Sequence, residues 1–249
     1  MPPCLAPAIE VLSDAAAVAR RAAALLAEPL CDPDAPPTGL ATGRTMEPVY
    51  AALCERLRGD GRFDPQGWCS FNLDEYVGLT PQDPRSFRAY MGRHLGDPLA
   101  LPPQALQLPD GAAADPAVEA CRYGEAVRRQ GLGLQLLGLG SNGHVGFNEP
   151  PCEVAAPCRV VQLSDSTRRQ NAESFGGDPG NVPALAITLG LAEILAAREL
   201  LLVVLGAGKA GILRRALQDP ADAQLPASWL QGHPQVRVLC DREAAALLG

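Results

Sequence analysis

Short runs of apolar residues alternate along the chain with longer segments in which apolar residues recur at helical spacing. The short runs are rich in Leu, Val and Ile, which suits buried strands. This alternation is typical of βαβ units arranged around a mainly parallel sheet. It predicts an α/β protein whose residues 1–249 form a single domain.

The expected strands are 39–42, 68–73, 133–139, 159–163, 184–189, 200–205 and 236–240. The expected helices are a first one that ends near residue 28, then 46–58, 84–95, 116–130, 166–174, 207–217 and 241–248. Ser13 or Asp14 is expected to cap the first helix, because a short polar side chain can accept from the free N–H groups of the first turn. The stretch 96–115, rich in Pro, Asp and Leu, is expected to be an excursion on the surface.

Composition narrows the classes of function. The net charge is −7, and no cluster of basic residues offers a surface for nucleic acid. The first residues lack the basic and apolar regions of a secretory signal, and no apolar run approaches the roughly 20 residues of a membrane span. We therefore expect a cytoplasmic protein that binds neither nucleic acid nor a membrane. Of its 21 basic residues only Lys209 is a lysine, which raises the question of why this one was retained.

Eight cysteines are scattered along the chain, with no CxxC pair among them. This spacing supports neither a zinc knuckle nor a thioredoxin-type motif, and the chain is too long for a disulfide scaffold. We expect most of the cysteines to be small buried apolar residues, and we expect no metal.

Ligands of open α/β sheets bind beyond the carboxyl ends of the strands, so polar residues at strand ends are the candidates for function. The first such junction is Thr42, Gly43, Arg44 and Thr45, where a small turn leads into a helix. Backbone N–H groups in such a turn can bind an anion, and Arg44 adds a cation. A plain connection between strand and helix remains the alternative from spacing alone.

A later junction contains glycines 138, 140 and 143, which match GxGxxG after an expected strand. A dinucleotide fingerprint would have to open a helix there, but prolines within 144–158 prevent one. The segment 206–210 likewise lacks the first glycine and the Ser or Thr of a phosphate loop. Neither NAD nor ATP is therefore expected, and no cofactor is predicted.

The remaining candidates are four acid–base groups in loops, namely Asp74, Glu75, His144 and Glu149. A carboxylate at a strand end, with a histidine near a glutamate, suits proton transfer at different atoms of one small substrate. Each feature also has a structural explanation. The histidine could simply bond to the backbone, and Asp74 with Glu75 could form a solvated turn.

Two segments taken together favour a catalytic role for these residues. Residues 71–79 read FNLDEYVGL, and residues 139–150 read LGSNGHVGFNEP. Both closely resemble the glucosamine-6-phosphate deaminases. The resemblance continues through the segments 41–45, 86–91, 167–171, 205–210, 226–228 and 233–234. The related 6-phosphogluconolactonases share the fold but usually lack the EYVG and GFNEP endings.

The resemblance implies a modified Rossmann-like, three-layer α/β sandwich and a metal-free isomerisation of an amino sugar phosphate with loss of ammonia. Glucosamine 6-phosphate is the substrate that it favours. By position, Asp74 would move the proton from C2 to C1, His144 would assist ring opening, and Glu149 would orient His144. Asn142 stands among these catalytic residues where some members have Asp. Lys209 falls on the family's phosphate-binding lysine, beside the turn at 42–45.

Two positions depart from the family pattern. Glu173 replaces an arginine that helps to hold phosphate, and Arg44 stands where a small residue is common. Either Arg44 supplies the missing cation while held by Glu173, or the pocket accepts a different amino sugar. The presence of Lys209 favours the first explanation.

The resemblance also bears on regulation and assembly. Cys152, Arg159 and Val161 stand where regulated hexameric members have Ser, Arg and Lys, and the chain stops at residue 249. We therefore expect no activation by N-acetylglucosamine 6-phosphate, and a monomer or small homo-oligomer. A sugar-phosphate lactonase and a sugar-phosphate sensor without catalysis remain as alternatives.

Overall fold

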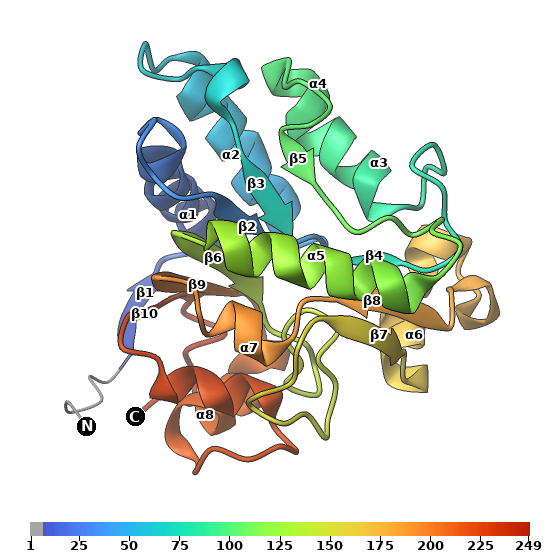
Figure 1. The fold of residues 1–249 in the computed structure, drawn as a ribbon. Coiled ribbons are helices and arrows are strands. Elements are labelled where there is room, and N and C mark those ends of the chain that lie inside the picture. Colours follow the sequence, from blue (N-terminus) through green and yellow to red (C-terminus); the bar gives the residue numbers. More distant parts are fainter. Residues whose placement is uncertain (1–6) are drawn as a thin grey trace.

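The computed structural model describes residues 7–249, and its main feature is a sheet of seven parallel strands (Figure 1). The strands lie in the order β1-β10-β9-β6-β2-β3-β5. Their bounds are β1 Ala8–Leu12, β2 Thr38–Leu40, β3 Ser70–Asn72, β5 Leu106–Gln107, β6 Leu134–Gly138, β9 Glu199–Val204 and β10 Val236–Asp241. Parallel strands with central Leu and Val residues buried on both faces explain the near-continuous apolar runs in the sequence.

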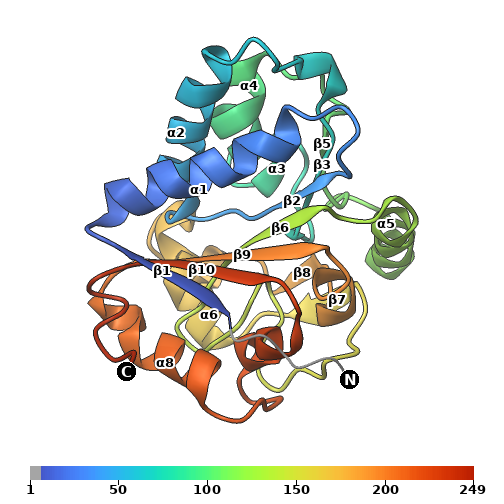
Figure 2. The ribbon, with the colours of Figure 1, turned by 90° about the vertical axis from the view of Figure 1, so that its left-hand side faces the viewer.

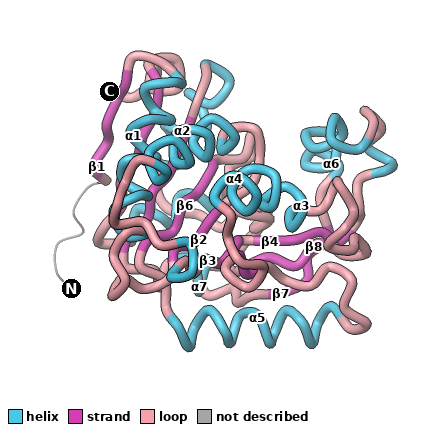
Figure 3. The backbone as a smooth tube through the Cα atoms, turned by 90° about the horizontal axis from the view of Figure 1, so that it is seen from above, coloured by secondary structure: helices cyan, strands magenta, loops and turns pink. Residues whose placement is uncertain are grey.

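Three further strands form a small antiparallel sheet in the order β4-β8-β7. They are β4 Asp74–Tyr76, β7 Arg159–Gln162 and β8 Leu185–Thr188. Only Leu73 separates β3 from β4, so the chain leaves one sheet and enters the other within a single residue. Seen from above, the small sheet and α6 lie at the opposite end of the molecule from the two termini (Figure 3).

Helices cover both faces of the main sheet. Figure 2 shows α1 and α2 on one side of it and α8 on the other. The helices are α1 Ala15–Leu30, α2 Met46–Arg58, α3 Phe87–Met91, α4 Asp97–Leu99, α5 Pro116–Gln130, α6 Asp165–Asn171, α7 Leu191–Ile194 and α8 Ala210–Gln218. Short 3₁₀ segments lie at Pro65–Gly67, Ala172–Phe175, Pro179–Asn181, Ala207–Lys209 and Pro226–Gly232, and a π-helical turn lies at Gly92–Gly96. The arrangement is the expected three-layer α/β sandwich.

Local chemistry explains where the long helices begin. The Asp14 carboxylate accepts from the Ala17 N–H at 2.8 Å, so Asp14 rather than Ser13 caps α1. Asp115 caps α5 in the same way, and Pro116 follows at the first helical position, where its missing N–H costs nothing. The predicted ranges 46–58 and 116–130 match α2 and α5.

Several expectations are wrong. The helix predicted over 84–95 begins later, at Phe87, and runs on to Leu99 as α3, a π-helical turn and α4. The helix predicted over 241–248 is a series of turns, because Asp241 still belongs to β10 and its carboxylate accepts from the Ala244 N–H. The stretch 96–115 contains the edge strand β5 and buries Leu99, Leu106 and Leu108, so it is not only a surface excursion.

Three strands escaped prediction because their sequences carry little signal. β5 has two residues, β4 reads Asp-Glu-Tyr, and β1 is an edge strand with several exposed positions.

The expectation that most cysteines are buried is confirmed, since five of the seven described cysteines are buried, and none of the seven forms a disulfide. Cys4 lies outside the described residues. No helix within residues 7–249 has the length and hydrophobicity to span a membrane.

Candidate active site

A pocket of about 1080 Å³ opens where β2, β3, β6 and β9 end. It brings together seven of the nine residues predicted from the sequence, namely Thr42, Gly43, Arg44, Thr45, Asp74, His144 and Lys209. These residues come from four separate segments that meet only because parallel strands present their carboxyl ends at the same edge. The other two, Asn142 and Glu149, do not line the pocket.

Asp74 is the buried carboxylate of this pocket, with 5% of its surface exposed. It begins β4, where it pairs with Thr188 of β8. Burial raises the pKa of Asp74 well above its usual value, and the neighbouring charge of Glu75 adds to the shift. A carboxylate in this condition accepts a proton readily, as a base at carbon must.

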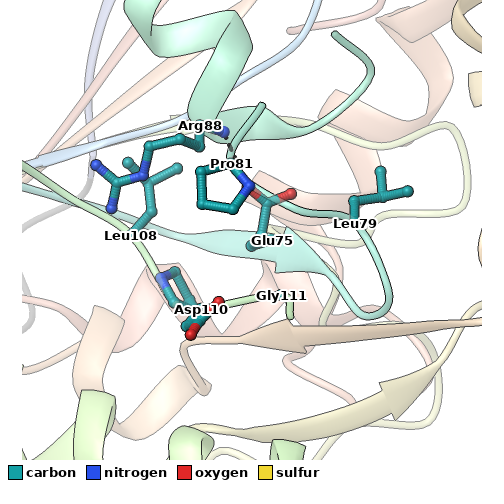
Figure 4. Close-up of a pocket in the computed structure, with 8 residues that line it drawn as sticks. Glu75, Leu79, Pro81, Arg88, Leu108, Asp110 and Gly111 are labelled. Carbon is teal, nitrogen blue, oxygen red and sulfur yellow. Dashed lines mark hydrogen bonds between the residues drawn. The ribbon is translucent and has the colours of Figure 1, made fainter. Parts of the chain in front are cut away.

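Glu75 points away from Asp74 because successive residues of a strand face opposite sides. Its carboxylate accepts from the backbone N–H groups of Tyr76, Phe87 and Arg88 at 2.8–2.9 Å. It lines a separate cavity of about 280 Å³, shown in Figure 4. Glu75 therefore stabilises the start of α3, and both carboxylates are too buried for a solvated turn.

His144 lies against Gly140, where an added Cβ would come within 2.4 Å of three ring atoms. Burial lowers the pKa of His144 to about 4, although the charge of Glu149 opposes the shift. The Lys209 charge lowers it further. The Nδ1 atom is buried and has no hydrogen-bond partner among residues 7–249. The imidazole is therefore neutral at pH 7 and keeps one nitrogen available.

Asn142 and Glu149 form a second layer behind the histidine. The Asn142 amide donates to Glu149 Oε2 at 3.2 Å, and its oxygen accepts from the His144 backbone N–H at 3.2 Å. The Ser164 N–H donates to Glu149 Oε1 at 3.0 Å. Burial alone would raise the pKa of Glu149, but the hydrogen bonds from Ser164 outweigh it and lower the pKa. Glu149 reaches the imidazole through its charge and through Asn142, since no bond joins it to the ring within the described residues.

The turn between β2 and α2 forms one wall of the pocket. Gly43 has a φ of +110°, which favours glycine, and its carbonyl accepts from the Met46 N–H at 2.8 Å. The backbone N–H groups of Thr42, Gly43 and Arg44 have no acceptor among residues 7–249. Free N–H groups next to the N-terminus of a 13-residue helix are suited to an anion.

Arg44 and Glu173 form an ion pair of 2.5 Å across the mouth of the pocket. The sequence-based suggestion that Glu173 holds Arg44 is thus confirmed. The side chains are 74% and 77% exposed, so solvent screens the pair and it contributes little to stability.

Lys209 is half-buried at the end of the loop that follows β9, and burial lowers its pKa. No carboxylate among the described residues pairs with it. Gly206 begins this loop at a φ of +86°, and its N–H donates to both oxygens of Asp241 at 3.0 and 3.1 Å. Asp241 was missed from the sequence, although a carboxylate at the end of a predicted strand was a usable signal.

Other cations of the pocket were also missed. Arg85, Arg93 and Arg169 line it, together with His94. Arg85 is paired with Asp83 at 2.6 Å, and Arg93 donates to the Pro84 carbonyl at 3.0 Å. In a chain with so many arginines, composition gave no reason to select these three.

Residues 13–239 match the family model described as glucosamine-6-phosphate isomerases/6-phosphogluconolactonase. A glucosamine-6-phosphate deaminase of Rhodopirellula baltica is 39% identical over 241 residues, which covers 96% of this chain and 95% of the relative. The solved structure of a monomeric glucosamine-6-phosphate deaminase is 36% identical, with a TM-score of 0.91 and coverage of 96% of this chain and 99% of the other.

A 6-phosphogluconolactonase from Trypanosoma brucei has the same fold, with a TM-score of 0.76, 20% identity and coverage of 98% and 99%. The chain therefore belongs to the glucosamine-6-phosphate isomerase/6-phosphogluconolactonase family.

Proposed function

We propose that the protein is an enzyme that converts a 2-amino-2-deoxyhexose 6-phosphate, glucosamine 6-phosphate first, with water into fructose 6-phosphate and ammonia. The observation that carries this proposal is a contrast in similarity. The chain is 36% identical to a deaminase at a TM-score of 0.91, but only 20% identical to a lactonase at 0.76. The pocket supplies groups that suit each step of the deaminase reaction.

Ring opening is assigned to His144. Its neutral imidazole takes the proton of the anomeric hydroxyl while the C1–O5 bond breaks, and the imidazolium then delivers that proton to O5. The ionised Glu149 stabilises the imidazolium that forms in this step. Asn142 fixes the segment between them through its two hydrogen bonds.

Isomerisation is assigned to Asp74. The carboxylate removes the proton from C2 of the open-chain sugar while O1 takes up a proton from solvent, which gives an enolamine, and the carboxyl group then returns the C2 proton to C1. The product is a ketimine at C2. Water adds there, the C2–N bond breaks, and ammonia leaves. Because the acceptor and donor are the same buried carboxyl group, its raised pKa suits both halves of the transfer.

The phosphate end is assigned to Lys209, the N–H groups of the Thr42–Thr45 turn, and Arg44. The charge of Glu173 would repel a phosphate, but its ion pair with Arg44 reduces that repulsion. A second candidate is a deaminase for an amino sugar that carries another anionic group. The Arg44–Glu173 ion pair favours it, because a carboxylate is not expected in a site that binds only phosphate.

The setting follows from this chemistry. We place the enzyme in the cytoplasm, in the breakdown of N-acetylglucosamine, where release of ammonia consumes water as in other hydrolases. We expect a monomer, as the solved deaminase at 36% identity is described, and no activation by N-acetylglucosamine 6-phosphate. Sigmoidal kinetics that this ligand abolishes would contradict the last point.

One experiment separates the candidates. Ammonia release is measured with glucosamine, galactosamine and mannosamine 6-phosphates, and hydrolysis of 6-phosphogluconolactone is measured in parallel. We expect ammonia from glucosamine 6-phosphate and no lactone hydrolysis. Lactone hydrolysis without ammonia would make the protein a lactonase, and binding without turnover would make it a sensor.

A further inference from the structure

Two tyrosines contact the backbone around the Thr42–Thr45 turn, and of these Tyr90 also lines the pocket whereas Tyr50 does not. Tyr50 belongs to α2 and is fully buried, and its hydroxyl donates to the Ala41 carbonyl. Tyr90 belongs to α3 and is 9% exposed, and its hydroxyl donates to the Gly43 carbonyl at 3.0 Å. The two phenols therefore hold alternate carbonyls of the same turn.

A held carbonyl determines the direction of the next N–H. In a trans peptide the C=O and the N–H point in opposite directions. The peptide that carries the Ala41 carbonyl also carries the Thr42 N–H, and that of Gly43 carries the Arg44 N–H. With both carbonyls bound to phenols, the Thr42 and Arg44 N–H groups point the opposite way and have no acceptor among residues 7–249, and both residues line the pocket.

The two phenols are held in place by their surroundings. Their rings meet edge to face, with centroids 6.5 Å apart, and the Tyr90 ring packs on His94 at 4.3 Å. Burial raises the pKa of both Tyr50 and Tyr90, so each stays a protonated donor throughout the neutral range.

We propose that Tyr90, assisted by Tyr50, is a positioning residue for the anion subsite, whose hydroxyl turns the amides of the Thr42–Thr45 turn toward a phosphate oxygen. The phosphate ester as ligand rests on the proposed function. The orientation of the turn rests only on the hydrogen bonds of Ala41 and Gly43.

The test is Tyr90→Phe, which removes one hydroxyl and leaves the ring. Loss of one hydrogen bond that sets an amide corresponds to about a five- to tenfold rise in the KM for glucosamine 6-phosphate, with kcat within about twofold. Tyr50→Phe should act in the same direction. Tyr123→Phe is the control, because that phenol is also buried and its hydroxyl contacts the Asn72 and Gln107 carbonyls at 2.7 and 3.1 Å rather than the turn. Its KM should stay within about twofold.

A second measurement does not depend on turnover. In ¹⁵N-labelled protein, inorganic phosphate should shift the amide signals of Thr42 and Arg44, and the midpoint of that titration should rise about five- to tenfold in Tyr90→Phe. The Tyr123→Phe midpoint should match the wild type.

The outcomes are distinct. An unchanged KM and midpoint in Tyr90→Phe would overturn the proposal, as would an equal rise in Tyr123→Phe or the absence of any shift at Thr42 and Arg44 in the wild type. If the wild type releases no ammonia yet phosphate still shifts these amides with the expected dependence on Tyr90, the proposed function fails and the positioning role stands.

Discussion

The two ends of the pocket are built differently. At the end proposed for proton transfer, Asp74 is 5% exposed and the His144 ring packs against Gly140, so burial shifts both pKa values. At the mouth, Arg44 and Glu173 meet as an ion pair whose side chains are about three-quarters exposed. Position and protonation at the first end depend on packing, whereas the second end depends on charges in water.

This difference predicts which substitutions matter. A buried group cannot be replaced by solvent, so its removal changes the reaction itself. An exposed charge is screened, and neighbouring cations such as Arg85 and Arg169 can compensate in part. The mouth is therefore the region in which substrate preference can change without loss of the chemistry.

The largest effect is expected for Asp74→Asn. The amide cannot accept the C2 proton, so kcat should fall by about 10³-fold or more. Ammonia release measures the loss, and a denaturant titration should show unfolding free energy no lower than in the wild type. Glu75→Gln is the comparison: it weakens the bonds to the start of α3 and should lower the unfolding free energy by about 1–3 kcal/mol, with turnover retained. If Asp74→Asn kept full turnover, Asp74 would not be the base.

Gly140→Ala tests whether packing positions the imidazole. The new Cβ would overlap the His144 ring and displace it, so we expect kcat to fall about 10²-fold. Gly211→Ala serves as the control because nothing lies near its added Cβ. Equal kcat values for the two variants would mean that the position of the ring is not critical.

Lys209→Arg tests the half-buried cation of the pocket. A guanidinium is planar and larger than an ammonium, so it should not enter a close cluster of phosphate oxygens. The KM for the phosphate ester should rise about tenfold while the thermal midpoint of unfolding stays close to the wild type. An unchanged KM would mean that Lys209, although half-buried, does not bind the phosphate closely.

A smaller effect is expected for Arg44→Ala at the mouth, a rise in KM of about threefold that shrinks as salt is added. Glu173→Gln should lower the KM slightly, because it frees Arg44 and removes a repulsive charge. Kinetics on phosphorylated and unphosphorylated glucosamine measure both variants. If Arg44→Ala uses the phosphate ester as well as the wild type does, Arg44 has no role in binding it.

The last prediction concerns pH and stability rather than turnover. His144 has a pKa of about 4 when folded and about 6.5 when unfolded, so the unfolded chain binds the proton first as pH falls. This residue should therefore lower the unfolding free energy between pH 6.5 and 4, with its full contribution present above 6.5. The raised pKa of Asp74 acts in the opposite direction, so the measurement is the difference between wild type and His144→Gln across that range. A difference that does not vary with pH would mean that burial does not shift this histidine.

Much of the fold could be predicted from the sequence because its signals are local. Apolar runs located the central strands β6, β9 and β10, and a capping residue located the start of α1. The short strands β4 and β5 could not be found, since two or three residues carry no period.

The sequence by itself determined the chemical groups of the site: a carboxylate at residue 74, a histidine among glycines, a small turn that leads into a helix, and a single lysine. Only the tertiary structure decided their relations. It directed Asp74 into the pocket and Glu75 away from it, joined Arg44 to Glu173 across 129 residues, and placed Tyr90 against the turn. The physical reason is that the sequence fixes the identity of each side chain. Its burial, pKa and orientation depend on residues far away in the sequence, which only folding brings close.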